Sequence, residues 1–156
     1  MILMTDTTQT TKKTTIMKKL FPILFISLFA LLACEEENIA INNDIRNFIE
    51  QKYEGATILY AEKDFNGEID VEIIHNNIKK EVKFNRKNQW INTSWDVAIH
   101  QLPDIVQESV QNSYPQYIIE DADYVETPTG DYYRIELEKG EWEKIILVTA
   151  DGEIIN

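Results

Sequence analysis

The chain has few of the residues from which catalytic and metal sites are most often built. Its 156 residues include one cysteine and two histidines. The single cysteine, Cys34, excludes an internal disulfide, so the fold must be stabilised by packing alone. His75 and His100 have no partner ligand at metal-binding spacing, and we interpret both as surface or hydrogen-bonded residues. The sequence also lacks a Gly-x-Ser-x-Gly motif and a glycine-rich loop before a helix, so nucleophilic and phosphate-binding sites lack their usual parts.

Basic residues are also scarce. The sequence has 15 lysines and arginines against 27 aspartates and glutamates, which gives a formal net charge of −12. Such a surface repels nucleic-acid phosphates and anionic lipid headgroups, and it favours basic partners or divalent cations. We therefore expect no nucleic-acid partner.

The apolar run over residues 20–33 is too short to span a membrane. It has 14 uncharged residues, whereas a spanning helix needs about 20. It follows the basic Met17-Lys18-Lys19, and this order and length are typical of a signal peptide. We assign residues 1–33 to a signal region whose true start is Met17.

The run ends in Leu31-Leu32-Ala33-Cys34. This sequence resembles the lipobox of bacterial lipoproteins, in which a lipidated cysteine becomes the mature N-terminus, so we predict lipidation of Cys34. The alternatives are an ordinary secretory signal with a chance cysteine, or an N-terminal anchor helix. Residues 34–40 would then form an acidic tether, and acidic residues after the cysteine resemble a signal for display on the outer surface. The expected location is the bacterial cell envelope, with the anchored domain facing the periplasm or displayed on the outside.

The stretch from Gly130 to Ile155 reads as a β-hairpin followed by a third short strand. Apolar residues alternate with polar ones before Lys139-Gly140-Glu141, and Asp151-Gly152 marks a second tight turn. The same pattern occurs 64 residues earlier. The matched pairs are Ile69 and Tyr133, Val71 and Ile135, Ile73 and Leu137, Ile78 and Trp142, Val82 and Ile146, Phe84 and Val148, and Ile91 and Ile155. We interpret the chain as a duplication whose matched residues face a helix.

Each unit begins with a predicted amphipathic helix. Residues 42–53 carry apolar residues at helical spacing, with Asn42 or Asn43 as the N-cap. A second helix is predicted from Leu102 to Tyr114, with Ile105 in its buried stripe and Pro103 in its first turn. Before it, Thr93 to Asp96 resembles a capping box and predicts a short helical turn.

These patterns predict an α+β fold. Each unit has one helix and about four antiparallel strands, and the tandem units form one curved sheet of about eight strands with both helices packed on one face. The domain covers residues 41–156 and comprises two repeats, 41–92 and 93–156. We expect a monomer.

The sheet face away from the helices is the predicted binding surface. In the second unit it mixes tyrosine, arginine, glutamate and aliphatic residues, a composition typical of recognition surfaces. The candidate residues are Tyr132, Arg134, Glu136, Glu143, Ile145 and Leu147. The alternative is an ordinary half-exposed sheet face, or a second packing layer.

Two segments, LPDIVQESVQNSYP and GDYYRIELEKGEWEKIILVTADGEII, resemble the PepSY-like, β-lactamase-inhibitor-like (BLIP-like) bacterial lipoproteins, and the resemblance covers roughly residues 38–156. It implies an envelope lipoprotein without established enzymatic activity. The wider PepSY group is associated with binding or restraining peptidases, which suggests a protein or peptide partner. We do not expect β-lactamase inhibition, because the turns at Asn66-Gly67 and Asn76-Asn77 are minimal and carry no carboxylate at the tip.

Two other functions remain as alternatives to a binding module without a cofactor. One is a small-ligand or calcium-binding protein, for which the densest acidic cluster is Glu120, Asp121, Asp123 and Glu126. This cluster lacks the spacing of a calcium loop, so we predict no metal site. The other is a hydrolase whose paired carboxylates meet only in the fold. No carboxylate pair stands out in the sequence, and we expect no enzymatic activity.

Overall fold

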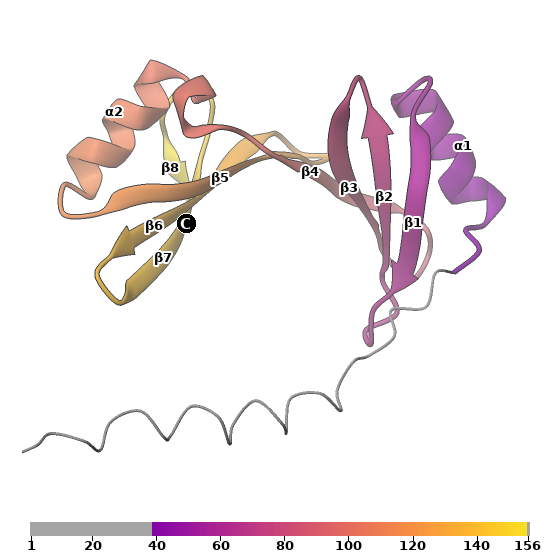
Figure 1. Cartoon of the computed structure of the whole chain (residues 1–156). Coiled ribbons are helices and arrows are strands. Elements are labelled where there is room, and N and C mark those ends of the chain that lie inside the picture. The colour runs from indigo at the N-terminus through magenta and orange to yellow at the C-terminus, as the bar shows by residue number, and fades with distance from the viewer. Residues whose placement is uncertain (1–38, 156) are drawn as a thin grey trace, which may run out of the picture. The chain divides into compact units, whose positions relative to one another are not determined.

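The computed structural model describes residues 39–155, which belong to one compact unit (Figure 1). The predicted signal region, Cys34 and most of the acidic tether lie outside the described residues. The elements are α1 (Asn43–Lys52), β1 (Thr57–Lys63), β2 (Ile69–His75), β3 (Ile78–Phe84), β4 (Trp90–Asp96), the short 3-10 helix η2 (Ile99–Gln101), α2 (Asp104–Ser113), β5 (Ile118–Glu126), β6 (Tyr132–Lys139), β7 (Trp142–Val148) and β8 (Ile154–Ile155). Among these residues no helix is long and apolar enough to cross a membrane.

The strands form one eight-stranded antiparallel sheet in which every strand pairs with its neighbour in sequence. The predicted α+β class with about eight strands is therefore confirmed. The β2–β3 turn shows why short connections suffice. Asn76 and Asn77 have φ angles of 53° and 64°, the left-handed conformation that a two-residue hairpin turn needs and that asparagine tolerates.

Both helices begin and end close to the predicted positions. The Asn42 side chain accepts a hydrogen bond from the backbone N–H of Ile45 at 3.0 Å, so Asn42 is the N-cap of α1. Helix α2 begins just after Pro103, which occupies the cap position rather than the first helical turn. It ends at Ser113, with Tyr114 as the C-cap next to Pro115.

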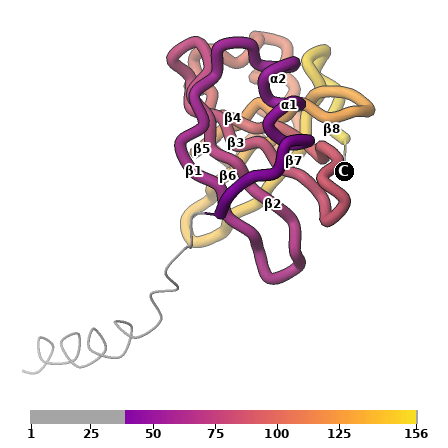
Figure 2. The backbone as a smooth tube through the Cα atoms, turned by 90° about the vertical axis from the view of Figure 1, so that its right-hand side faces the viewer, coloured from indigo at the N-terminus to yellow at the C-terminus, as the bar shows by residue number. Residues whose placement is uncertain are grey.

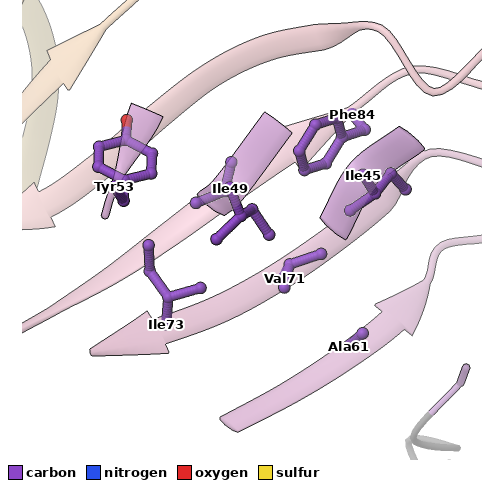
Figure 3. Packing of buried hydrophobic residues seen from close by; sticks show 8 residues of the cluster. Ile45, Ile49, Tyr53, Ala61, Val71, Ile73 and Phe84 are labelled. Atoms are coloured by element: carbon purple, nitrogen blue, oxygen red, sulfur yellow. The ribbon is translucent and has the colours of Figure 1, made fainter. Parts of the chain in front are cut away.

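Each helix covers its own hydrophobic core. Under α1 the buried residues are Ile45, Ile49, Tyr53, Ala61, Val71, Ile73, Val82 and Phe84 (Figure 3). Under α2 they are Leu102, Val106, Val110, Ala122, Ile135, Leu137, Ile146 and Val148. Val82 of the first core pairs with Thr93 on β4, and Thr93 pairs with Glu126 on β5, so these three residues share one sheet face. Ala122 lies four residues before Glu126 on β5, hence on the same face, and it belongs to the second core. Both helices therefore lie on the same face of the sheet. The packing of both helices on one face is confirmed.

Three residues that we expected to be buried are exposed. Ile78 and Trp142 are 42% and 74% exposed, because each is the first residue after a tight turn, at the end of its strand. Ile105 is 49% exposed, because it lies beside the buried stripe of Leu102, Val106 and Val110 rather than on it.

The β7–β8 turn packs against α2 beside Ile105. A Cβ on Gly152 would lie 3.0 Å from Ile105 Cγ1 and from its carbonyl oxygen, and the φ angle of Gly152 is +86°. Glycine is therefore required in this turn.

The predicted helical turn at Thr93 to Asp96 is wrong, because these residues belong to β4. Residues 90–94 of this strand pair with β3, whereas 93–96 pair with β5, so β4 joins the two halves of the sheet (Figure 1). Thr93 is fully buried, and its hydroxyl accepts a hydrogen bond from the Trp90 indole at 3.0 Å. Strand pairing on both sides overrides the local capping pattern, and the predicted boundary between residues 92 and 93 lies inside this strand.

Candidate binding face

The open face is the sheet face away from both helices, and the six candidate residues lie on it. Arg134 pairs with Leu147 and Glu136 with Ile145, in alternation with the buried Ile135 and Ile146. Tyr132 and Glu143 follow from the same period of two. Ile145 is 59% exposed, which shows that no second layer of the described chain covers this part of the face.

Arg134 is held by a cross-strand partner. Asp123 lies directly opposite it on β5, and the guanidinium donates from Nε and Nη2 to Asp123 Oδ2 at 2.9 and 2.5 Å. This hydrogen bond raises the pKa of Arg134. Asp123 is only 8% exposed, so the pair is anchored in the sheet. Arg134 therefore presents a fixed charged edge rather than a freely moving side chain.

The open face is strongly acidic. By the strand register it carries ten acidic and three basic side chains. The acids are Glu62, Asp70, Glu72, Glu81, Asp96, Asp121, Asp123, Glu136, Glu138 and Glu143, and the bases are Lys79, Lys83 and Arg134. Two of the bases also form ion pairs, Lys79 with Glu72 at 2.7 Å and Lys83 with Asp70 at 3.3 Å. The remaining acids leave a field that attracts positive charge.

A hollow of about 210 Å³ opens in the middle of the sheet, where β3 and β4 stop pairing at Glu81 and Ser94. Its other lining residues include Lys80, Trp95 and Asp96. The Lys80 ammonium lies 3.3 Å from the centroid of the Trp95 ring and 5.2 Å from that of Tyr53, while burial lowers its pKa. The contact of Lys80 with Trp95 could not be predicted from the sequence, because it depends on how the two strands diverge.

Two carboxyl groups near this hollow have raised pKa values. The pKa of Glu81 is raised by partial removal from water and then by the charge of Asp70. The pKa of Asp96 is raised by the same loss of solvation, then by Asp123, which lies directly opposite on β5. Both carboxyls therefore hold a proton more readily than a free carboxyl does.

We expect Asp96→Asn to stabilise the fold by about 0.5 kcal/mol at pH 7, because like charges opposite each other on neighbouring strands are destabilising. A raised pKa in the folded state means that folding takes up a proton, so the wild-type loses stability as pH rises through the raised pKa. The gain from asparagine should therefore be absent at about pH 3, below the ordinary pKa of about 3.9 of an aspartate. Urea unfolding at both pH values measures this difference. An equal gain at both would show that the Asp96 charge is not the cause.

The acidic cluster at 120–126 does not converge on one point. Asp123 binds Arg134, whereas Glu126 lies on the helix-bearing face, where its Oε2 accepts a hydrogen bond from the Tyr53 hydroxyl at 2.6 Å and lies 3.3 Å from Lys52 Nζ. The pKa of Glu120 is raised by a hydrogen bond with Glu138. No group of three or more potential metal ligands gathers within residues 39–155.

The histidines lie apart from these acids. The ring of His75 lies 5.5 Å from that of Tyr53, and His100 is exposed in η2.

An antiparallel meander with one helix over each half and an uncovered acidic face defines an α+β protein built on a single sheet. Residues 67–156 match the family model described as "Putative beta-lactamase-inhibitor-like, PepSY-like". The chain belongs to this PepSY-like family, as the sequence resemblance indicated.

Solved structures with the same fold come from several Bacteroides species. A BLIP-like protein from Bacteroides fragilis has a TM-score of 0.67 and 19% identity over 78% of this chain and 88% of its own. A DUF2874 family protein from Bacteroides ovatus gives 0.65 and 18%, over 76% and 86%. A "putative periplasmic" protein from Bacteroides eggerthii gives 0.63 and 17%, over 76% and 88%. No curated protein matches the sequence. At these identities the structural likeness establishes the fold.

Proposed function

We propose that this chain is a cell-envelope lipoprotein whose domain binds a protein or peptide partner through the open face, without catalysis. The observation that carries the proposal is the exposure of Ile145 on a sheet face that neither helix covers. Ile145 lies opposite Glu136, next to Arg134 on the same face, and Tyr132 follows Arg134 along β6. Aromatic and arginine side chains contribute much of the energy in protein interfaces, and an exposed aliphatic residue gives them an apolar floor. The proposed partner is an envelope peptidase or another envelope enzyme that the domain restrains.

The family description and the predicted targeting signal support this proposal. The family description is inhibitor-like, which fits a domain that binds rather than catalyses. One structural neighbour is described as a putative periplasmic protein, which agrees with the predicted signal region and the predicted lipidation of Cys34 in this chain. The envelope location and the lipid anchor are parts of the same proposal.

The acidity of the open face indicates a basic partner surface. Ten acids against three bases produce a field that accelerates the approach of a cationic protein and slows that of an anionic one. The association rate should therefore fall as salt is added, while the dissociation rate depends more on the apolar contacts.

A double substitution, Tyr132→Ala with Ile145→Ser, tests the binding face. We expect it to weaken binding of a partner recovered from the envelope fraction at least tenfold, about 1.4 kcal/mol, and to leave the melting temperature nearly unchanged. Both side chains are partly or largely exposed, which is why the fold should tolerate their loss. Arg134 is kept, because its removal would leave the buried Asp123 carboxylate unpaired.

The matched control is Trp142→Ala. Trp142 is 74% exposed and alternates with Ile145 onto the helix-bearing face, so its loss removes an exposed apolar residue outside the proposed surface. Affinity measured by calorimetry should not change in this variant. A partner that is insensitive to the double substitution, or equally sensitive to Trp142→Ala, places the interface elsewhere.

The alternatives make different predictions. A calcium-binding protein would melt at a higher temperature when calcium is added, because a ligand of the folded state stabilises it. A hydrolase would use the facing carboxyls of Asp96 and Asp123, and Asp123→Asn would abolish turnover. The Asp123 carboxylate already accepts two hydrogen bonds from Arg134, which favours a structural role for it.

A further inference from the structure

One end of the sheet combines an exposed aromatic residue with basic residues. The pairs Lys63 with Ile69, Ile69 with Phe84, and Phe84 with Trp90 place the β1–β2 and β3–β4 loops at the same end of the first half of the sheet. Phe65, in the β1–β2 loop, is 97% exposed. Figures 1 and 2 both show this loop projecting beyond the strands. Transfer of such a side chain from water into an apolar environment is favourable.

Basic side chains surround the tip of this loop. A Cβ on Gly67 would lie 3.5 Å from the Cε of Lys63 and 3.5 Å from both the Cγ and Nε of Arg86. Lys87 follows in the β3–β4 loop. Among residues 39–155 none of these three cations forms an ion pair. The β1–β2 loop also carries two acids, Asp64 and Glu68, so the three cations exceed the acids of this end by one. The Asp64 carboxylate is turned into the loop, where it accepts a hydrogen bond from the Glu68 backbone N–H at 2.9 Å.

The chain enters the domain at this same end. The backbone N–H of Ile39 donates to the carbonyl oxygen of Ala61 at 2.7 Å, two residues before the end of β1. Cys34 is five residues before Ile39. A fully extended chain gains at most about 3.6 Å per residue, so a lipid on Cys34 would hold Ile39 within about 18 Å of its own attachment point.

We infer that the loop end formed by Lys63, Phe65, Arg86 and Lys87, which we call the basic loop end, contacts the lipid bilayer. This inference rests on the proposed lipid anchor at Cys34. Aromatic rings and long cationic side chains are the groups that settle at a membrane interface, the ring among the acyl carbons and the cations at the headgroups. The acidic remainder of the domain is repelled by anionic headgroups, which favours the orientation that brings the basic loop end toward the bilayer. The open face is then left accessible to a partner from the side.

A single fluorescent reporter tests this contact. The chain has one cysteine, which lipid would occupy, so Asn66→Cys provides one free thiol beside an intact Phe65. The lipidated protein carrying a fluorophore at this thiol is reconstituted into phosphatidylcholine vesicles with a minority of phosphatidylglycerol and headgroup-proximal nitroxide lipids. The control reporter is Ile78→Cys, which lies at the other end of β2 and β3 and is 42% exposed. Seven-residue strands separate the two reporters by about 20 Å.

We expect the nitroxides to quench the reporter at position 66 about threefold more strongly than the one at position 78. Adding Phe65→Ser, or Arg86→Ala with Lys87→Ala, to the Asn66→Cys protein should remove most of this difference. These side chains are exposed, so their replacement should not unfold the domain, and a lost difference in quenching would reflect lost membrane contact. Equal quenching at both reporters in vesicle-bound protein overturns the inference and leaves the anchor standing. Protein that does not sediment with the vesicles overturns both the anchor and the inference, whereas binding of a partner to the open face is measured separately and is unaffected.

Discussion

Val71→Asp should prevent cooperative folding of the domain. Val71 is fully buried under α1 and pairs with Ala61 and Val82, so a carboxylate there would have no water and no cationic partner (Figure 3). Burying an unpaired charge costs several kcal/mol, which is comparable to the total stability of about 5 to 15 kcal/mol of a domain. Val106→Asp should do the same from the second core, because Val106 is also fully buried. Circular dichroism on heating measures the loss.

The neighbouring residue supplies the control. Glu72 follows Val71 on β2 but lies on the open face, where it forms a partly exposed ion pair with Lys79. Such solvent-screened pairs contribute little to stability, so Glu72→Ala should melt close to the wild-type temperature. A Val71→Asp protein that melts cooperatively near that temperature would contradict the assignment of the two faces.

The sequence predicts the sheet well because the relevant signals are local. Alternation with a period of two decides which side chains of β6 and β7 are buried, and a tight turn fixes which residues face each other. The buried Ile135, Leu137 and Ile146 follow from this pattern alone. The six candidate residues follow as well, because they are the alternate positions of the same two strands and their neighbours.

Contacts between distant segments could not be predicted in this way. The ion pair between Asp123 and Arg134 depends on the register of β5 and β6. That register depends in turn on the connecting loop, residues 127–131, which is held by hydrogen bonds from Thr127 to Asp131 and to Gly130. Tyr53 and Glu126 are 73 residues apart and meet only when β4 bridges the two halves. The strand at Thr93 was missed for the same reason. Its local sequence resembles a helix cap, and only pairing on both sides makes it a strand.

Because Arg134 is bound to Asp123, substitutions at Tyr132 and at Arg134 have different consequences for the fold. From the sequence, Tyr132 and Arg134 look equivalent as exposed anchors. In the structure only Tyr132 can be removed without leaving a buried carboxylate unpaired. A loss of binding in an Arg134 variant would therefore mix a change in stability with a change at the interface. The Tyr132 and Ile145 substitutions separate these two effects.

We expect Cys34→Ser to abolish lipid attachment at the proposed anchor. A lipidated cysteine holds a protein at the membrane through acyl chains, each worth about 0.8 kcal/mol per buried methylene. The basic loop end offers one phenylalanine and three cations, which together orient a tethered domain but cannot replace these chains. Serine lacks the thiol that carries the lipid. The variant should therefore appear as a soluble mature protein or as an uncleaved precursor.

Metabolic labelling with a radioactive fatty acid, followed by fractionation and gel electrophoresis, distinguishes these forms. Glu36→Gln is the matched control, because it changes the acidic tether and keeps the cysteine. It should label and fractionate as the wild-type does. If the Cys34→Ser protein still incorporates fatty acid and remains with the membrane at the mature size, the anchor is not at Cys34. The reach of about 18 Å that places the basic loop end at the bilayer would then lose its basis.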